Sequence, residues 1–162
     1  MTSREILLKP TQALLEALTN PDPTNPNHLL STFTTIPTPV VHEHGLPQLA
    51  PFLGRPFTGQ DGIAAYFDLL SSLLSVRNML FEPEESWVVD ESCMAVSLRG
   101  TATFVWKETR QAWDETFVYR IKLAVDSSED PVKKGGWRFA SIMFGRIQAR
   151  RILLEWGSWG SC

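Results

Sequence analysis

The chain has 162 residues, 43% of them hydrophobic and 20% charged, with a formal net charge of −3 and a pI near 5.6. These values fit one globular domain over residues 1–162 and argue against intrinsic disorder. The acidic excess also argues against general nucleic-acid binding, which needs a broad basic surface.

The cellular address follows from cysteine use and hydropathy. Cys93 and Cys162 are too few for a disulfide framework, so a reducing compartment is expected. Residues 1–10 are too polar for a signal peptide. No stretch approaches the roughly 18 apolar residues of a membrane helix. The sequence therefore predicts a cytoplasmic protein that does not enter a membrane.

The first predicted element is a helix over residues 3–19. Its apolar residues recur at helical spacing, and they are Ile6, Leu7, Leu14, Leu15 and Leu18. Pro10 marks either an interruption or a later start. A loop rich in proline follows over residues 20–26, then a short apolar helix or turn over 28–33. Residues 40–44 read as a short edge-type strand.

A loop over residues 46–58 precedes the strongest helix signal of the chain. Helical spacing of four, three and four residues links Ile63, Phe67, Leu70 and Leu74. From Val76 onward the pattern is that of long strands, predicted over 78–90, 93–108, 111–125 and 136–150. Short connections between them imply antiparallel neighbours, and helices followed by a meander imply an α+β fold. Strands of this length normally bend, so the sheet is expected to be strongly curved.

Alternation of side chains predicts which strand faces point inward. In the second long strand the core face carries Met94, Val96, Leu98, Gly100, Ala102, Phe104 and Trp106. In the third it carries Trp113, Glu115, Phe117, Tyr119, Ile121, Leu123 and Val125. Glu115 and Tyr119 are polar exceptions on this face. Burying a carboxylate is costly unless it is paired or hydrogen-bonded, so Glu115 is the main functional candidate. The alternatives are a wet strand end for Glu115 and a core position for Tyr119.

His42 and His44 lie two residues apart and share one face of their strand, whereas Glu43 points the opposite way. Zinc or iron binding would need a third ligand, and none has diagnostic spacing. One histidine as a proton-transfer group and ordinary polar strand residues both stay open. The sequence has no phosphate-binding loop or nucleophile elbow, so no metal or other cofactor is predicted.

Three segments resemble a known superfamily. One is Phe57-Thr-Gly-Gln-Asp-Gly-Ile-Ala-Ala-Tyr-Phe-Asp-Leu-Leu70. The other two are His42-Glu-His-Gly-Leu-Pro47 and Trp113-Asp-Glu-Thr-Phe-Val-Tyr-Arg120. With the order of elements, they resemble the NTF2-like superfamily and its SnoaL-like members from filamentous fungi. The resemblance implies a cone, with N-terminal helices packed in a strongly curved antiparallel sheet around an apolar pocket.

Members of this superfamily are mostly cofactor-free acid/base catalysts, and others only bind partners, so the fold does not settle the function. The resemblance implies an isomerase, cyclase or dehydratase acting on a bulky apolar secondary metabolite. The alternative is a non-catalytic binding protein or dimer scaffold. SnoaL-type cyclases use an aspartate, whereas the last strand here ends Ser141-Ile-Met-Phe-Gly-Arg146, which counts against that chemistry.

The predicted catalytic residues are Glu115, Tyr119, His42 and His44. The substrate is expected to contact Phe67, Phe104, Trp106, Trp113, Phe117 and Met143. A homodimer is expected through the outward sheet residues Thr101, Thr103, Val105, Thr116 and Val118. The tail over residues 155–162 reads either as a flexible end or as a flap over the pocket mouth.

Overall fold

The computed structural model describes residues 3–22, 24–25, 27–129 and 135–147. Three helices, one 3-10 turn and seven strands follow one another in this part of the chain. They are α1 (Ser3–Thr19), α2 (His28–Ser31), β1 (Val40–Glu43), β2 (Pro56–Thr58), α3 (Gly59–Leu73), β3 (Leu74–Phe81), η1 (Glu84–Ser86), β4 (Val88–Asp90), β5 (Ala95–Trp106), β6 (Ala112–Val125) and β7 (Trp137–Ile147).

The strands form one sheet in the order β2-β1-β7-β6-β5-β3, and β4 pairs with the N-terminal end of β5. The meander β5-β6-β7 is antiparallel, as predicted. The sheet as a whole is mixed, because β1 runs parallel to β7. Parallel neighbours need a long connection, and here that connection contains most of the fold.

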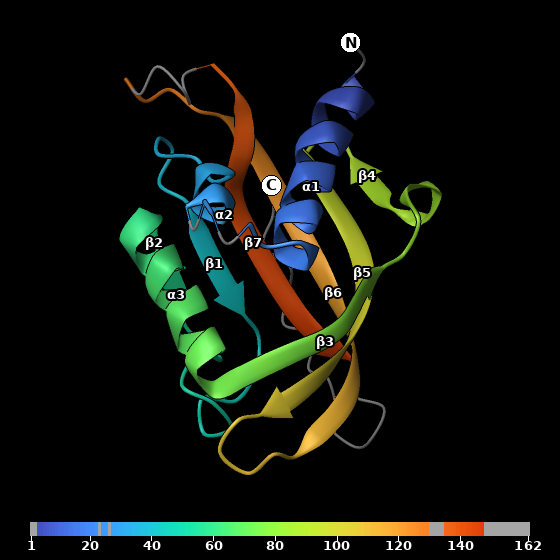
Figure 1. The fold of residues 1–162 in the computed structure, drawn as a ribbon. Coiled ribbons are helices and arrows are strands. Elements are labelled where there is room, and N and C mark those ends of the chain that lie inside the picture. The colour runs from blue at the N-terminus through green and yellow to red at the C-terminus, as the bar shows by residue number, and fades with distance from the viewer. Residues whose placement is uncertain (1–2, 23, 26, 130–134, 148–162) are drawn as a thin grey trace.

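The sheet is curved and does not close, and α1 and α3 lie against its concave side (Figure 1). Two irregularities interrupt its ladders, between Arg77 and Leu80 in β3 and between Lys122 and Leu123 in β6. Bulges of this kind bend a strand and increase its twist. Asn78, inside the first irregularity, has a φ of 52°. The α+β class and the strong curvature predicted from the sequence are therefore confirmed.

The core lies between the helices and the inner face of the sheet. Leu7 and Leu14 of α1 and Ile63 of α3 are completely buried. On the inner face of β5 and β6 the buried residues include Val96, Leu98, Ala102, Phe104, Phe117, Tyr119, Ile121 and Leu123. All of these belong to the faces predicted to point inward, so alternation gave the correct phase for both strands, although Ala95 and Val105 on the opposite face of β5 are buried as well.

Three predicted elements differ from the structure by more than a few end residues. The expected strand 78–90 is divided into β3 and β4, because Pro83 and the turn η1 interrupt it. The expected loop 46–58 ends in the short strand β2, which pairs with β1. α1 continues through Pro10 without a break, since buried leucines on both sides of the proline hold the helix against the core.

The tail 155–162 and Cys162 lie outside the described residues, as does the end of the predicted strand 136–150. Among the described helices, none is both long enough and apolar enough to cross a membrane. The cytoplasmic location stays a prediction.

Candidate functional site

A cavity of about 560 Å³ lies between the inner face of the sheet, α3, β3 and the C-terminal end of α1. Its deeply buried lining includes Glu43, Tyr66, Phe104, Glu115, Phe117, Tyr119 and Phe144. Its rim is exposed and includes Pro21, Asp68, Ser71, Val76 and Asn78. An apolar cavity with a few polar groups is how small-molecule sites are built.

Glu115 reaches the cavity from β6, and only 5% of it is exposed. The indole Nε1–H of Trp113, two residues earlier on the same strand, donates to Glu115 Oε2 at 2.9 Å. The inward orientation predicted from the sequence is therefore confirmed. The bond to a donor offsets part of the cost of burying the carboxylate.

Tyr119 lies four residues further along β6 and also lines the cavity. Its ring packs edge-on against Phe144 of β7, with 4.4 Å between the centroids, and lies 4.9 Å from Phe117. Phe117 thus separates Glu115 from Tyr119 along the strand, and the two polar groups address different parts of the cavity.

Glu43 is a second buried carboxylate in the cavity, and the sequence analysis did not propose it. It is 4% exposed and accepts a hydrogen bond of 2.8 Å from the hydroxyl of Tyr66 on α3. The Tyr66 ring stacks on Phe144 at 5.9 Å. In the sheet register Glu43 pairs with Phe144, which pairs with Tyr119. Glu43 and Tyr119 are therefore two strands apart, roughly 10 Å between their Cα atoms.

Only part of the signal for these two residues was in the sequence. Tyr66 follows Ile63 by three residues, so the helical stripe that predicts Phe67 also reaches Tyr66. The face of β1 could not be read in the same way, because Val40 and Val41 put one valine on each face.

His42 and His44 share a face, as predicted, but it is the face that does not line the cavity. Their rings lie 4.5 Å apart; His42 is half-buried and His44 is exposed. Burial and the neighbouring His44 lower the pKa of His42. Neither histidine lines the cavity, because alternation along β1 turns Glu43 inward instead, so the structure does not bring His42 or His44 together with Glu115 and Tyr119.

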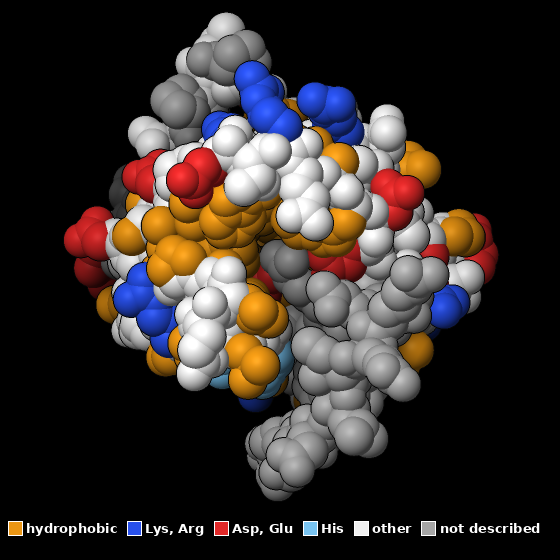
Figure 2. Space-filling model, turned by 90° about the horizontal axis from the view of Figure 1, so that it is seen from below, with side chains coloured by type: hydrophobic (Ala, Val, Ile, Leu, Met, Phe, Trp, Pro, Cys, Tyr) orange, Lys and Arg blue, Asp and Glu red, His pale blue; other side chains and the backbone are white. Residues whose placement is uncertain are grey.

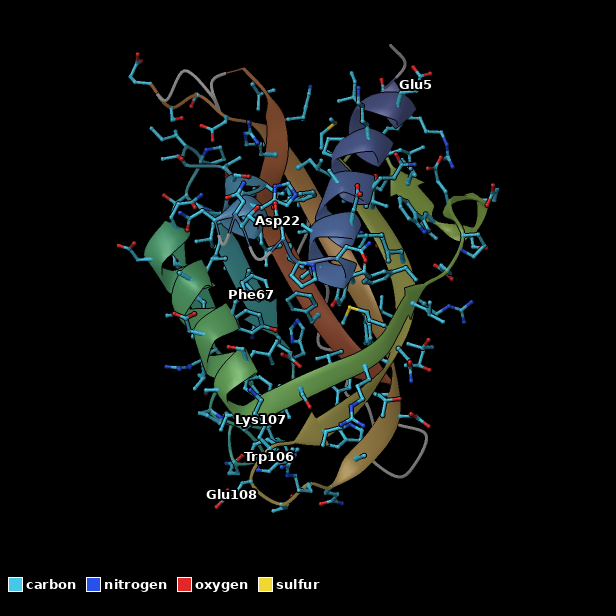
Figure 3. The ribbon with its side chains drawn as sticks, viewed as in Figure 1. Glu5, Asp22, Phe67, Trp106, Lys107 and Glu108 are labelled. Carbon is cyan, nitrogen blue, oxygen red and sulfur yellow. The ribbon has the colours of Figure 1, made fainter. Side chains whose placement is uncertain are left out.

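The predicted substrate contacts divide into two groups. Phe67, Phe104 and Phe117 line the cavity, whereas Trp106, Trp113 and Met143 do not. In Figure 3, Phe67 lies between α3 and the sheet, and Trp106 lies at the lower end of the molecule beside Lys107 and Glu108. Met143 does not line the cavity because its neighbour Phe144 lies on the inner face of β7, which turns Met143 to the opposite face.

Hydrophobic side chains also reach the surface on the side seen from below, where they gather near the middle with acidic side chains around them (Figure 2).

A second hollow, of about 350 Å³, lies against the sheet and is lined by Thr101, Thr103, Asp114 and Thr116 among others. Across the described ranges, no group of three or more His, Cys, Asp or Glu side chains is arranged to hold a metal ion.

Comparison with solved structures identifies the fold. An NTF2-like protein from Burkholderia xenovorans LB400 superimposes with a TM-score of 0.62 at 17% identity, covering 88% of this chain and 90% of that one. PrhC from Penicillium brasilianum gives 0.62 at 14% identity over 90% and 83%. BvnE pinacolase from Penicillium brevicompactum gives 0.59 at 14% identity over 90% and 88%.

The chain therefore has the NTF2-like cone fold, which confirms the fold that the resemblance implied. No family model matches the chain, and no curated protein matches it in sequence. At these identities the structural likeness defines the fold alone, so the function has to be argued from the cavity.

Proposed function

We propose that the protein is a cofactor-independent isomerase, cyclase or dehydratase that carries out acid/base chemistry on a bulky apolar metabolite. The observation that carries the proposal is the presence of two buried carboxylates, Glu43 and Glu115, in one aromatic cavity of about 560 Å³. Buried ionisable groups are costly to stability, and their presence in a cavity favours a catalytic role.

Glu115 is the general base in this proposal. It removes a proton from a carbon whose developing negative charge is delocalised onto an oxygen further along the substrate, and the hydroxyl of Tyr119 donates a hydrogen bond to that oxygen. Glu43 with Tyr66 is the second proton-transfer group, because a carboxyl bonded to a phenol can return a proton elsewhere on the same substrate. The chain itself supplies both steps, so we propose that no metal or nucleotide takes part.

The shape of the lining supports a bulky, mainly apolar substrate. Rings from α3 and three strands surround the two carboxylates, and they belong to Tyr66, Phe67, Phe104, Phe117, Tyr119 and Phe144. A polyketide-like or terpenoid-like ring system has the size and polarity for such a lining. Solved structures with this fold include a protein described as a pinacolase and one described as ketosteroid isomerase-like, which is compatible with this class of chemistry.

A proton-abstraction probe tests the base without knowledge of the natural substrate. In 5-nitrobenzisoxazole the base removes the proton on C3, the C–H electrons form the nitrile, and the N–O bond breaks to leave a coloured nitrophenolate. We expect Glu115→Gln to lower kcat for this elimination by roughly 10²-fold or more. Glu108→Gln, a control in the turn after β5, should leave it unchanged.

A wild-type rate no higher than that of Glu115→Gln would contradict the proposed base. If the protein also bound the probe tightly under those conditions, it would be a binding protein rather than an enzyme. Stoichiometric zinc or iron in protein purified without added metal would contradict the cofactor-free part of the proposal.

A further inference from the structure

A hydrogen bond joins the side chains of Trp113 and Glu115. Both residues lie on the inner face of β6, yet Trp113 does not line the cavity and Glu115 does. The 2.9 Å distance between Nε1 and Oε2 is that of a well-formed N–H···O bond. The indole can therefore act on a bound ligand only through the lining residues that it contacts, and Glu115 is the one to which it is hydrogen-bonded.

The indole itself is held in place from the other side. Trp113 pairs with Phe104 across β5 and β6, and the two rings stack with their centroids 5.8 Å apart and their planes 24° apart. Phe104 is buried and packs edge-on against Phe117 at 6.3 Å. The aromatic wall of the cavity thus fixes the ring that binds the carboxylate.

The chemistry of the donor decides what this bond can do. An indole N–H donates only and does not ionise near neutral pH, so it cannot pass a proton to Glu115. It can restrict the rotamers of a long, flexible side chain. A carboxylate has about four lone-pair sites, so one bond at Oε2 leaves it able to accept a substrate proton. Tyr66, the donor to Glu43, carries a hydroxyl that can both donate and accept.

We propose that Trp113 is a positioning residue that fixes the orientation of the Glu115 carboxylate for proton abstraction. The inference rests on the proposed function, because it assigns Trp113 a part in the same reaction. It replaces the expectation that Trp113 contacts the substrate. Misplacement of a reacting group by about 1 Å can cost roughly 10²-fold in rate, so loss of the hydrogen bond from Trp113 should lower kcat.

The test compares Trp113→Phe, which keeps an aromatic ring but removes the donor, with the control Trp106→Phe. With 5-nitrobenzisoxazole as the probe, we expect Trp113→Phe to lower kcat by about tenfold to 10²-fold with little change in KM. Trp106→Phe should change neither constant. In a Glu115→Gln background, Trp113→Phe should cause no further loss, because the two residues act through one bond.

An NMR measurement checks the bond without catalysis. The ¹H–¹⁵N signal of the Trp113 indole should shift in Glu115→Gln, where the acceptor loses its charge, and the Trp106 signal should not. An unshifted Trp113 signal would overturn the inference, and so would an unchanged kcat in a folded Trp113→Phe. Loss of rate in Glu115→Gln but not in Trp113→Phe refutes the positioning role alone. An unchanged rate in Glu115→Gln refutes the proposed base and, with it, the positioning role.

Discussion

At the scale of single residues, each of the two buried cavity carboxylates accepts a hydrogen bond from an aromatic side chain that carries no charge. Glu115 is bound by an indole and Glu43 by a phenol. A neutral donor stabilises a carboxylate less strongly than a positively charged side chain would in an ion pair. The arrangement therefore keeps two buried acids in place while leaving them chemically usable.

The bond between Tyr66 and Glu43 gives a prediction about stability. Tyr66→Phe removes the donor from a buried carboxylate, and we expect it to lower the free energy of unfolding by about 1–3 kcal/mol. In a Glu43→Gln background the same change should cost less, because the acceptor is no longer charged. Urea unfolding of the four proteins of this cycle gives the coupling energy, and an equal cost in both backgrounds would contradict the bond.

At the scale of elements, one glycine sets the shape of the cavity wall. Gly100 of β5 pairs with Phe117 of β6, and the Phe117 ring lies directly over it. A β-carbon there would overlap this ring and lie 3.0 Å from Cδ1 of Phe81. The absence of a side chain at Gly100 is therefore what lets Phe117 lie flat against the sheet.

Gly100→Ala should push Phe117 away from the sheet and into the cavity. We expect a loss of about 1–3 kcal/mol in the free energy of unfolding, as for other overpacked cores, together with weaker binding of any cavity ligand. Gly145→Ala in β7 is the matched control, since no described atom lies within 4 Å of its added β-carbon. A loss of stability in Gly145→Ala as large as that in Gly100→Ala would show that the cause is not the Phe117 ring.

The elements also show which parts of the fold and site a sequence can predict. β5 and β6 alternate polar and apolar residues over many positions, so their inner faces, and with them Glu115 and Tyr119, could be assigned. β1 has four residues with a valine on each face, so the inward position of Glu43 could not. Its parallel pairing with β7 depends on contacts far apart in the chain, which periodicity does not contain.

At the scale of the whole molecule, Asp126 joins the end of β6 to the segment before β1. Its carboxylate accepts hydrogen bonds from the backbone N–H groups of Thr35, at 2.7 Å, and of Ser128, at 2.9 Å. Burial by itself raises the pKa of Asp126, but hydrogen bonds from Ser128, Thr35 and Ile36 outweigh it and lower the pKa below 3.8. The ionised carboxylate is thus the form that the fold stabilises.

Because the folded pKa lies below the unfolded one, the unfolded chain binds more protons in acid. The stabilisation by Asp126 is therefore complete above pH 3.8 and is lost as the pH falls through the lower folded value. We expect Asp126→Asn to cost about 1–3 kcal/mol at neutral pH and progressively less in acid. Urea unfolding over this range measures the difference, with Asp68→Asn on exposed α3 surface as control. A cost that does not depend on pH would contradict this account.

We also propose that two copies associate through the outer face of the sheet. Of the residues expected there, Val105 is already buried within one chain, whereas Thr101, Thr103, Thr116 and Val118 remain partly or fully exposed. Light scattering should give a dimer mass at micromolar concentration. Val118→Lys should give a monomer, because burying the added charge in the interface would be costly. A monomer mass for the unchanged protein would refute the proposal.

The parallel pairing of β1 with β7 affects how the protein folds during its synthesis. Val40 pairs with Ser141, so closing this contact joins segments roughly 100 residues apart, and contacts of such long range slow folding. During synthesis β1, which carries Glu43, can pair with β2, but it lacks its other sheet neighbour until β7 has left the ribosome. The cavity therefore forms late in folding, and a ligand that fills it would bind only chains in which β7 has already paired with β1.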